Sequence, residues 1–132
     1  MKLSVVLATR NEEENIARCL ESVKTIADEI IVFDEYSTDR TKEIVESFGA
    51  KVYLEPHHDI FHITKQKAID MAKGEWILQM DADEVITKEL AVEITKVINM
   101  SNEEILNRKP KSEKLRQLFE RHQRLIEERD GK

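Results

Sequence analysis

Two apolar runs flank a helical pattern in residues 3–34, LSVVLATRNEEENIARCLESVKTIADEIIVFD. The runs at residues 3–8 and 29–34 are short and rich in β-branched side chains, which is typical of strands buried on both faces. Between them, Asn11 lies three residues before Glu14, as a helix-capping pair does. The apolar side chains that follow recur at helical spacing: Ile16, Leu20 and Val23. This order predicts a strand, a helix and a second strand.

The same alternation continues as far as residue 99. The further elements expected are a helix capped by Ser37, Thr38 or Asp39 and ended by Gly49, a strand at residues 51–55, a helix at residues 64–73 ended by Gly74, a strand at residues 76–80, and a helix from Thr87. Serine, threonine and aspartate are preferred helix caps, and glycine is common just after a helix. A helix in every connection predicts an α/β fold, in which helices flank a mostly parallel sheet with right-handed crossovers.

Length and composition limit the class of protein. A chain of 132 residues is one domain or part of a larger one, and 40% hydrophobic residues suffice for a core. The apolar runs are far shorter than the ~20 residues of a membrane span. No hydrophobic leader follows Met1, so a signal peptide is not expected. The single cysteine, Cys19, excludes an internal disulfide and fits a reducing cytosol, and the net charge of −6 argues against nucleic-acid binding.

Charge divides the chain near residue 100. Residues 1–99 are strongly acidic, whereas residues 100–132 are slightly basic and carry one apolar helical stripe. The stripe consists of Leu115, Leu118, Phe119, Leu125 and Ile126. We expect an α/β domain at 1–99 and a charged amphipathic helical tail or insertion at 100–132. Such a helix would dock on its own domain, pair with a helix in an oligomer, or lie peripherally on a membrane.

Polar residues follow three of the four expected strands, at residues 8–12, 34–39 and 81–84. In open α/β sheets, ligands bind outside the carboxyl ends of the strands. Like charges crowded at one edge are costly unless a cation or a hydrogen-bonding ligand is present. The sequence therefore predicts a binding site at this edge of the sheet.

Asp81 and Asp83 are the sharpest feature of that edge. Two carboxylates one residue apart, directly after a buried strand, can both turn toward one hard cation. Mg²⁺ or Mn²⁺ prefers oxygen ligands and completes its shell with water and phosphate oxygens. Aspartate is also common in turns, where it caps the next helix. The residues alone leave both interpretations open.

Three segments together resemble the inverting family 2 glycosyltransferases of the GT-A fold: SVVLATRNEEENIARCLESV at 4–23, DEIIVFDEYSTDRTKEIVESFGAKVY at 28–53, and KQKAIDMAKGEWILQMDADE at 65–84. The DEYSTD and DADE forms are similar to the branch of lipopolysaccharide-core β-1,4-glucosyltransferase-like proteins. The resemblance covers residues 3–95 and implies a Rossmann-like, donor-binding N-terminal half. In the family, the acceptor site and the general base come well after the D-x-D motif.

The resemblance also implies which residues bind the nucleotide-sugar. They are Ala8, Thr9, Arg10, Asn11, Glu12, Asp34, Glu35, Ser37, Asp39, Lys65, Asp81 and Ala82, with Asp81 and Asp83 as metal ligands. Asp34 or Glu35 would hydrogen-bond the base, Asp81 would approach the ribose, and Asp83 would hold the metal on the diphosphate. Lys65 would lie near the donor. The general base is unassigned. Glu84 is the local candidate for it, but we expect Glu84 to orient the site instead.

The expected activity is transfer of a sugar from a nucleotide-diphosphate sugar, with UDP as the first choice, to a glycan or lipid-linked acceptor. Mg²⁺ or Mn²⁺ would assist, in the cytoplasm at the inner face of a membrane, in cell-envelope glycan biosynthesis. One alternative is a truncated or partner-dependent nucleotide-binding module without turnover. Another is a haloacid-dehalogenase-like phosphatase, because residues 81–85 also match D-x-D-x-[TV], with Asp81 as the nucleophile.

Other residues admit competing interpretations. A zinc hypothesis arises from His57, His58, Asp59 and His62, of which the second and fourth are one helical turn apart. No second ligand cluster accompanies them, so a solvated loop near the sugar pocket is the alternative. Cys19 and Trp76 are expected to pack in the core, the tryptophan in preference to stacking on a sugar.

Overall fold

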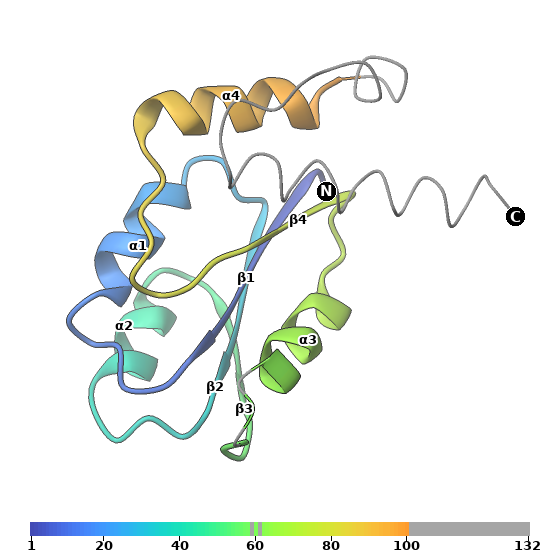
Figure 1. Cartoon of the computed structure of the whole chain (residues 1–132). Coiled ribbons are helices and arrows are strands. Elements are labelled where there is room, and N and C mark those ends of the chain that lie inside the picture. The colour runs from blue at the N-terminus through green and yellow to red at the C-terminus, as the bar shows by residue number, and fades with distance from the viewer. Residues whose placement is uncertain (59, 61, 101–132) are drawn as a thin grey trace, which may run out of the picture.

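The computed structural model describes residues 1–58, 60 and 62–100. Strands and helices alternate along this part of the chain (Figure 1). In order they are β1 (Leu3–Thr9), α1 (Ile16–Val23), β2 (Glu29–Asp34), α2 (Thr41–Ser47), β3 (Lys51–Leu54), α3 (His62–Met71), β4 (Trp76–Gln79) and α4 (Lys88–Ile98). No helix among the described residues is long and apolar enough to cross a membrane. The predicted helix at 100–132 lies outside them, except for Met100, and the boundary at residue 99 stays a prediction.

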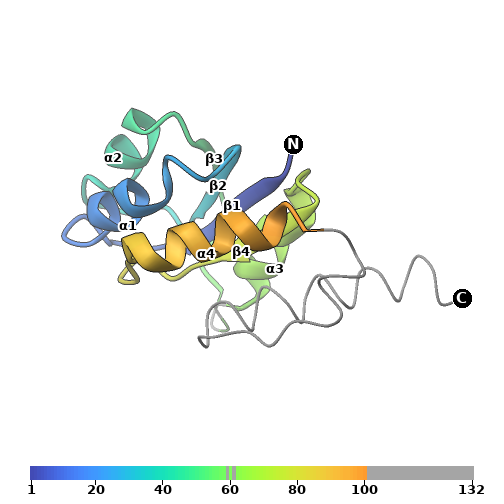
Figure 2. The ribbon, with the colours of Figure 1, turned by 90° about the horizontal axis from the view of Figure 1, so that it is seen from above.

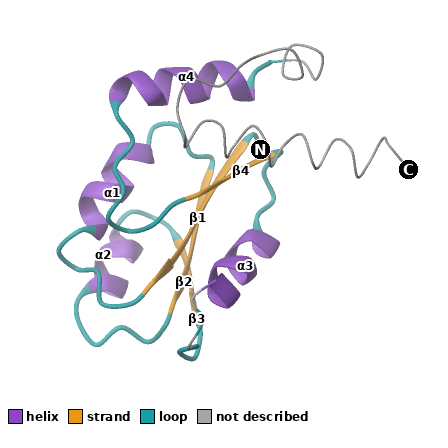
Figure 3. Cartoon of the chain, viewed as in Figure 1, coloured by secondary structure: helices purple, strands orange, loops and turns teal. Residues whose placement is uncertain are grey.

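The strands form one parallel sheet in the order β3-β2-β1-β4 (Figure 3). In β1, Val6 lies opposite Ile31 of β2 on one side and opposite Gln79 of β4 on the other. The chain moves outward from β1 to β3 and then returns to the far side of β1 for β4. This reversal is a topological switch point, where open α/β sheets form their ligand crevice. The prediction of a parallel α/β sheet is confirmed.

Alternate residues of β1 face two helical layers, because side chains point to opposite faces along a strand. Leu3, Val5 and Leu7 share a core with apolar residues of α1, α2 and α4, whereas Val6 packs with Ala68 of α3. Figure 1 shows α1 and α2 on one side of the strands and α3 on the other, and the view from above in Figure 2 agrees. All of β1 is buried, so it fixes the position of the loop that follows it.

Two buried residues confirm their predicted places in the core. Trp76 is 2% exposed and Cys19 is 0% exposed, and both belong to the larger apolar cluster. The tryptophan begins β4 and is buried in this cluster, so it offers no surface to a sugar.

The two glycines expected to end helices have different roles. Gly49 follows α2 with φ +76°, a left-handed conformation that favours glycine, which confirms that prediction. Gly74 does not end α3, because that helix ends at Met71. A Cβ on Gly74 would lie 2.7 Å from Oγ of Ser4 and 2.8 Å from its backbone nitrogen. Glycine therefore allows the α3–β4 connection to pass close to β1.

The predicted starts of α1 and α3 differ from the observed ones, and that of α4 is confirmed. α1 begins at Ile16, so Asn11 does not cap it; Asn11 has φ +53°, and its Oδ1 accepts a hydrogen bond from the backbone of Thr38. A tertiary contact thus replaces the local capping pattern. α3 begins at His62, before its predicted start at residue 64. The helix predicted from Thr87 is confirmed to within one residue: α4 begins at Lys88, and Thr87 is its N-cap, since its hydroxyl accepts a backbone hydrogen bond from Leu90 at 3.1 Å.

Candidate functional site

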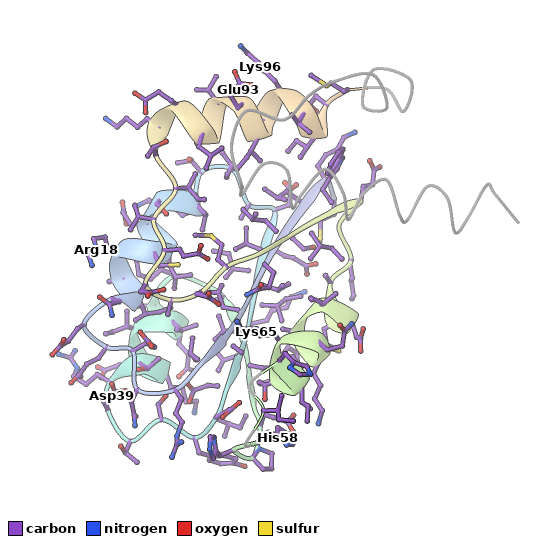
Figure 4. All side chains as sticks on the ribbon, viewed as in Figure 1. Arg18, Asp39, His58, Lys65, Glu93 and Lys96 are labelled. Atoms are coloured by element: carbon purple, nitrogen blue, oxygen red, sulfur yellow. The ribbon has the colours of Figure 1, made fainter. Side chains whose placement is uncertain are left out.

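A hollow of about 270 Å³ opens at the carboxyl ends of β1 and β4, beside the switch point of the sheet. Its lining comes from β1 and the loop after it, from α3, and from the turn after β4: Ala8, Glu12, Lys65, Asp81, Ala82 and Asp83. Each is a predicted site residue, and the fold brings them together from three distant segments. A larger hollow, about 490 Å³, lies between α1 and the start of α4 near Arg18 (Figure 4) and contains no predicted site residue.

The turn after β4 presents its carboxylates at the surface. Ala82 is buried, whereas Asp81 and Asp83 on either side of it are exposed. Glu84 closes the turn twice: its Oε1 accepts a hydrogen bond from the backbone nitrogen of Asp81 at 2.8 Å, and its own backbone nitrogen donates to the Asp81 carbonyl at 3.0 Å. Because Thr87 caps α4, helix capping does not explain the two aspartates.

Lys65 reaches Asp81 across the hollow. Its Nζ lies 2.8 Å from Oδ1 of Asp81, and the two side chains are 27% and 51% exposed. Figure 4 shows Lys65 beside α3 and the strands. The same Oδ1 is 3.4 Å from Nε2 of Gln79, and Sγ of Cys19 contacts the Asp81 carbonyl at 3.7 Å. Asp81 is therefore fixed through both its side chain and its backbone.

Asp83 is the open carboxylate of the site. It forms no hydrogen bond or ion pair with any other residue that the structure describes. Magnesium and manganese sites at phosphates commonly use one or two carboxylates, with water and phosphate oxygens completing the shell. Within residues 1–58, 60 and 62–100, no group of three or more His, Cys, Asp or Glu residues is placed to hold a metal ion. Asp81 and Asp83 thus fit a cation shared with a ligand, and not a cage made by protein alone.

The remaining residues predicted to bind the nucleotide-sugar do not line the hollow: Thr9, Arg10, Asn11, Asp34, Glu35, Ser37 and Asp39. Asp34 is 1% exposed, and its Oδ1 accepts hydrogen bonds from the hydroxyls of Thr9 at 2.7 Å and Ser37 at 2.6 Å. The Ser37 backbone donates to the other oxygen at 2.9 Å. The Ser37 hydroxyl in turn accepts from the backbone of Asn11 at 2.8 Å. These residues join the loops after β1 and β2.

Asp39 strengthens the same junction. Its Oδ1 accepts hydrogen bonds from the backbone and the hydroxyl of Thr41, which begins α2, and its Oδ2 accepts from the backbone of Glu13 at 3.1 Å. Partial burial raises the pKa of Asp39, but these hydrogen bonds outweigh it and hold the pKa below the ordinary value. Arg40, however, occupies the N-cap position of α2 and makes no side-chain cap hydrogen bond, so the cap predicted at Ser37, Thr38 or Asp39 is wrong. Asp39 instead ties the first residue of the helix to the loop after β1. A ligand contact by Asp39 or Ser37 stays a prediction.

Glu35 lies at the centre of a network that the sequence did not suggest. It is 1% exposed; its Oε1 lies 2.6 Å from Nδ1 of His57, and its Oε2 accepts from the Thr64 hydroxyl at 2.6 Å. Arg10 Nη1 lies 3.2 Å from the other ring nitrogen of His57. Asp34 and Glu35 both accept internal hydrogen bonds, and the contact with the nucleotide base predicted for one of them stays a prediction. Arg10 and Glu35 were predicted to bind the nucleotide and His57 belonged to the zinc hypothesis, but no sequence pattern indicated that they contact one another.

The zinc hypothesis has no support among the described residues. His57 is held by Glu35, and His58 Nε2 lies 3.0 Å from Oε1 of Glu55, so the two histidines bind separate carboxylates. Asp59 lies outside the described residues. His62 begins α3, and the partly exposed side chain of His57, at 46%, fits the alternative of a solvated loop.

Comparison with known proteins gives a family. The model of the glycosyl transferase family 2 matches residues 4–126. An uncharacterized glycosyltransferase of Rickettsia bellii is 44% identical over 103 residues, which cover 78% of this chain and 35% of the relative. The glycosyltransferase SunS of Bacillus subtilis is 39% identical over 89 residues, covering 66% and 21% respectively. The chain thus spans about a third of the length of its first curated relatives.

Solved structures agree with this family. Residues 1–349 of Staphylococcus aureus TarS align with a TM-score of 0.67 and 33% identity, over 75% of this chain and 32% of that one. Glucosyl-3-phosphoglycerate synthase of Mycobacterium tuberculosis, solved with Mn²⁺ and UDP, aligns with a TM-score of 0.54 and 26% identity, over 61% and 33%. These likenesses confirm the Rossmann-like GT-A fold. Together with the family match, they argue against the alternative of a haloacid-dehalogenase-like phosphatase. The chain belongs to glycosyltransferase family 2.

Proposed function

We propose that the described residues bind a UDP-sugar together with Mg²⁺ or Mn²⁺, as the donor half of an enzyme that glycosylates a glycan or lipid-linked acceptor. One observation carries the proposal: the hollow at the switch point holds the exposed carboxylates of Asp81 and Asp83 beside the ammonium group of Lys65. A diphosphate with a bound cation has the charges that this arrangement complements.

The solved relatives support the choice of nucleotide and metal. TarS has been solved with UDP, and the mycobacterial synthase with Mn²⁺ and UDP-glucose. At 30% and 26% identity, these proteins are related in sequence as well as in fold. Their ligands match the requirements of two carboxylates and a lysine at a sheet edge.

Each residue of the hollow has a distinct task in this proposal. When bound, the cation would supply positive charge that stabilises the departing diphosphate. Asp83 and Asp81 would hold that cation, and Lys65 would offer a second positive charge to the phosphate oxygens. Glu84 acts as a positioning residue, because its carboxylate holds the backbone of Asp81. An inverting transfer also needs a general base to deprotonate the acceptor hydroxyl. Because the Glu84 carboxylate binds the backbone of Asp81, we leave that base unassigned.

Calorimetric titration tests the proposal. UDP is titrated into the 132-residue chain with Mn²⁺ and again with EDTA, for the wild type, Asp83→Asn and the control Asp70→Asn. Asp70 lies on α3 and accepts a hydrogen bond from Gln66 at 2.9 Å, away from the hollow. We expect metal-dependent binding in the wild type and the control, and its loss in Asp83→Asn. Equal affinity in all samples, with or without metal, contradicts the metal assignment.

Titrations with GDP and dTDP decide the nucleotide. Binding of either one in preference to UDP contradicts the choice of uridine but leaves the diphosphate site intact. Failure of all three nucleotides contradicts a donor site in this chain.

A nucleotide-binding module without turnover is the second candidate. It is favoured by the contact of the Glu84 carboxylate with the backbone of Asp81, which occupies the local candidate for a general base. The test is incubation of the chain with a radiolabelled UDP-sugar and a glycan or lipid-linked acceptor. A labelled product, or release of UDP above the buffer control, excludes this candidate.

A further inference from the structure

We propose that Lys65 is an internal counter-ion that makes cation binding depend on the nucleotide. Without nucleotide, its ammonium group occupies Asp81 and leaves Asp83 as the open ligand. A bound diphosphate draws Lys65 to the phosphate oxygens and releases Asp81 to the cation. The inference rests on the proposed function, since it describes how that same site is loaded.

The geometry places the ammonium group where a cation would compete with it. Lys65 Nζ lies 2.8 Å from Oδ1 of Asp81, and both residues line the hollow with Asp83. Lysine and a divalent cation both seek carboxylate oxygen, so the oxygen that serves one is lost to the other. With one of its two aspartates neutralised, the site attracts a free cation less strongly.

The exchange requires the motion of one side chain only. Glu84 holds the backbone of Asp81 at 2.8 Å, and Cys19 contacts its carbonyl, so the turn is already formed around the pair. Lys65 belongs to α3, and its flexible stem carries a compact charge that rotates without moving the helix. A diphosphate carries more negative charge than one carboxylate, which favours the transfer of Lys65 from Asp81 to the nucleotide.

This exchange couples the two ligands. Nucleotide raises the affinity for the cation because it removes the competing ammonium group, and the cation raises the affinity for nucleotide by the same factor. A variant without the ammonium group has Asp81 available from the start. It therefore binds the free cation more tightly and gains less from the nucleotide.

Titration with Mn²⁺, followed by the electron paramagnetic resonance signal of free Mn²⁺, measures these affinities without relying on turnover. The samples are wild type, Lys65→Gln, Lys65→Met and the control Lys67→Gln, each with and without UDP. Lys67 lies two residues along α3 and pairs with Glu55 at 2.6 Å, outside the hollow. The Lys67→Gln variant removes one positive charge, as the Lys65 variants do, but leaves the ion pair between Lys65 and Asp81 in place.

Without UDP, we expect both Lys65 variants to bind Mn²⁺ about fivefold more tightly than wild type, the upper end for a partly exposed ion pair. Lys67→Gln is expected to match the wild type. Far-ultraviolet circular dichroism checks the fold of each variant.

Two results overturn the inference: Lys65 variants that bind free Mn²⁺ no more tightly than wild type, or Lys67→Gln with the same gain, which would reduce the effect to net charge. Failure of the proposed function is separate, because it appears as wild-type protein that does not bind UDP with Mn²⁺. The titration without nucleotide still measures the competition between Lys65 and Mn²⁺ in that case.

Discussion

Replacing Glu29 with glutamine tests how far one buried carboxylate holds the sheet together. The Glu29 side chain is 3% exposed at the first residue of β2. It accepts hydrogen bonds from the Ser4 hydroxyl of β1 and from the backbone of Lys73 at 2.7 Å, and it forms an ion pair with Lys51 of β3 at 3.1 Å. The Ser4 hydroxyl also accepts from the backbone of Gly74 at 2.8 Å. One carboxylate thus joins three strands and the α3–β4 connection.

Glutamine keeps the length of the side chain and removes its charge. A hydrogen bond to a charged group contributes about 1.5–3 kcal/mol and a neutral one about 1 kcal/mol, so the bonds from Ser4 and Lys73 each lose about 0.5–2 kcal/mol, roughly 1–4 kcal/mol together. The ion pair adds at most about 0.5 kcal/mol, because the Lys51 side chain is 49% exposed and water replaces its partner. We expect Glu29→Gln to lower the free energy of unfolding at pH 7 by about 2 kcal/mol, measured by urea denaturation.

The loss is expected to depend on pH. Burial raises the pKa of Glu29, but hydrogen bonds from Ser4, the Lys73 backbone and Lys51 outweigh it and hold the pKa below its ordinary value of 4.5. A carboxylate with a lowered pKa adds stability above its unfolded-state pKa and loses it as the pH falls through the folded-state value. The difference between wild type and Glu29→Gln is therefore constant near neutral pH and shrinks below pH 4.5.

Glu75→Gln is the matched control for this experiment. Glu75 pairs with Lys2 at 3.5 Å, and their side chains are 62% and 51% exposed, so a change within about 0.5 kcal/mol is expected. Equal losses in the two variants would refute the reasoning from burial. A loss in Glu29→Gln that persists unchanged in acid would refute the role of its charge.

Two further predictions concern Gly74, which lies close to Ser4 of β1, and Glu84 in the turn after β4. Gly74→Ala places a Cβ 2.7 Å from the Ser4 hydroxyl and is expected to cost about 1–3 kcal/mol in urea denaturation; a stability equal to wild type contradicts the close approach. Glu84→Gln keeps an oxygen for the backbone of Asp81, so its metal-dependent UDP affinity is expected within about twofold of wild type, whereas Glu84→Ala binds more weakly. Calorimetry that finds both variants equally weak would assign the role to the charge and not to the turn.

The fold was largely predictable because its signals are local. The apolar runs of β1 and β2 are fully buried strands, as their β-branched composition indicates, and Gly49 has the left-handed conformation expected after a helix. Asn11 shows where local rules end. It fits a capping pattern, but a hydrogen bond from Thr38, on the loop after the next strand, places it in a left-handed turn instead. Asn11 and Thr38 are 27 residues apart, so a local capping pattern cannot indicate their contact.

The position of the candidate site was predictable, whereas the contacts between its side chains were not. Because ligands bind at the carboxyl ends of strands in open α/β sheets, Ala8, Glu12 and Asp83 were expected at one edge of the sheet. The structure places all three in one hollow. The contact of Lys65 with Asp81, and that of His57 with Glu35, depend on how α3 and the loop before it lie against the sheet. Such contacts follow from tertiary packing. Hydrophobic periodicity identifies a helix or a strand, but it does not show which residues of one segment lie against which residues of another.

The crowding of carboxylates at this edge predicts a cation only after their hydrogen bonds are taken into account. Asp34, Glu35 and Asp39 accept hydrogen bonds from hydroxyl, imidazole and backbone groups, so their charge is already stabilised within the protein. The need for an added positive charge falls on Asp81 and Asp83. Lys65 meets half of it at 2.8 Å from Asp81, and a cation brought by a diphosphate would meet the rest. For this reason the decisive variants are those of Asp83 and Lys65, and not those of the more numerous acidic residues after β2.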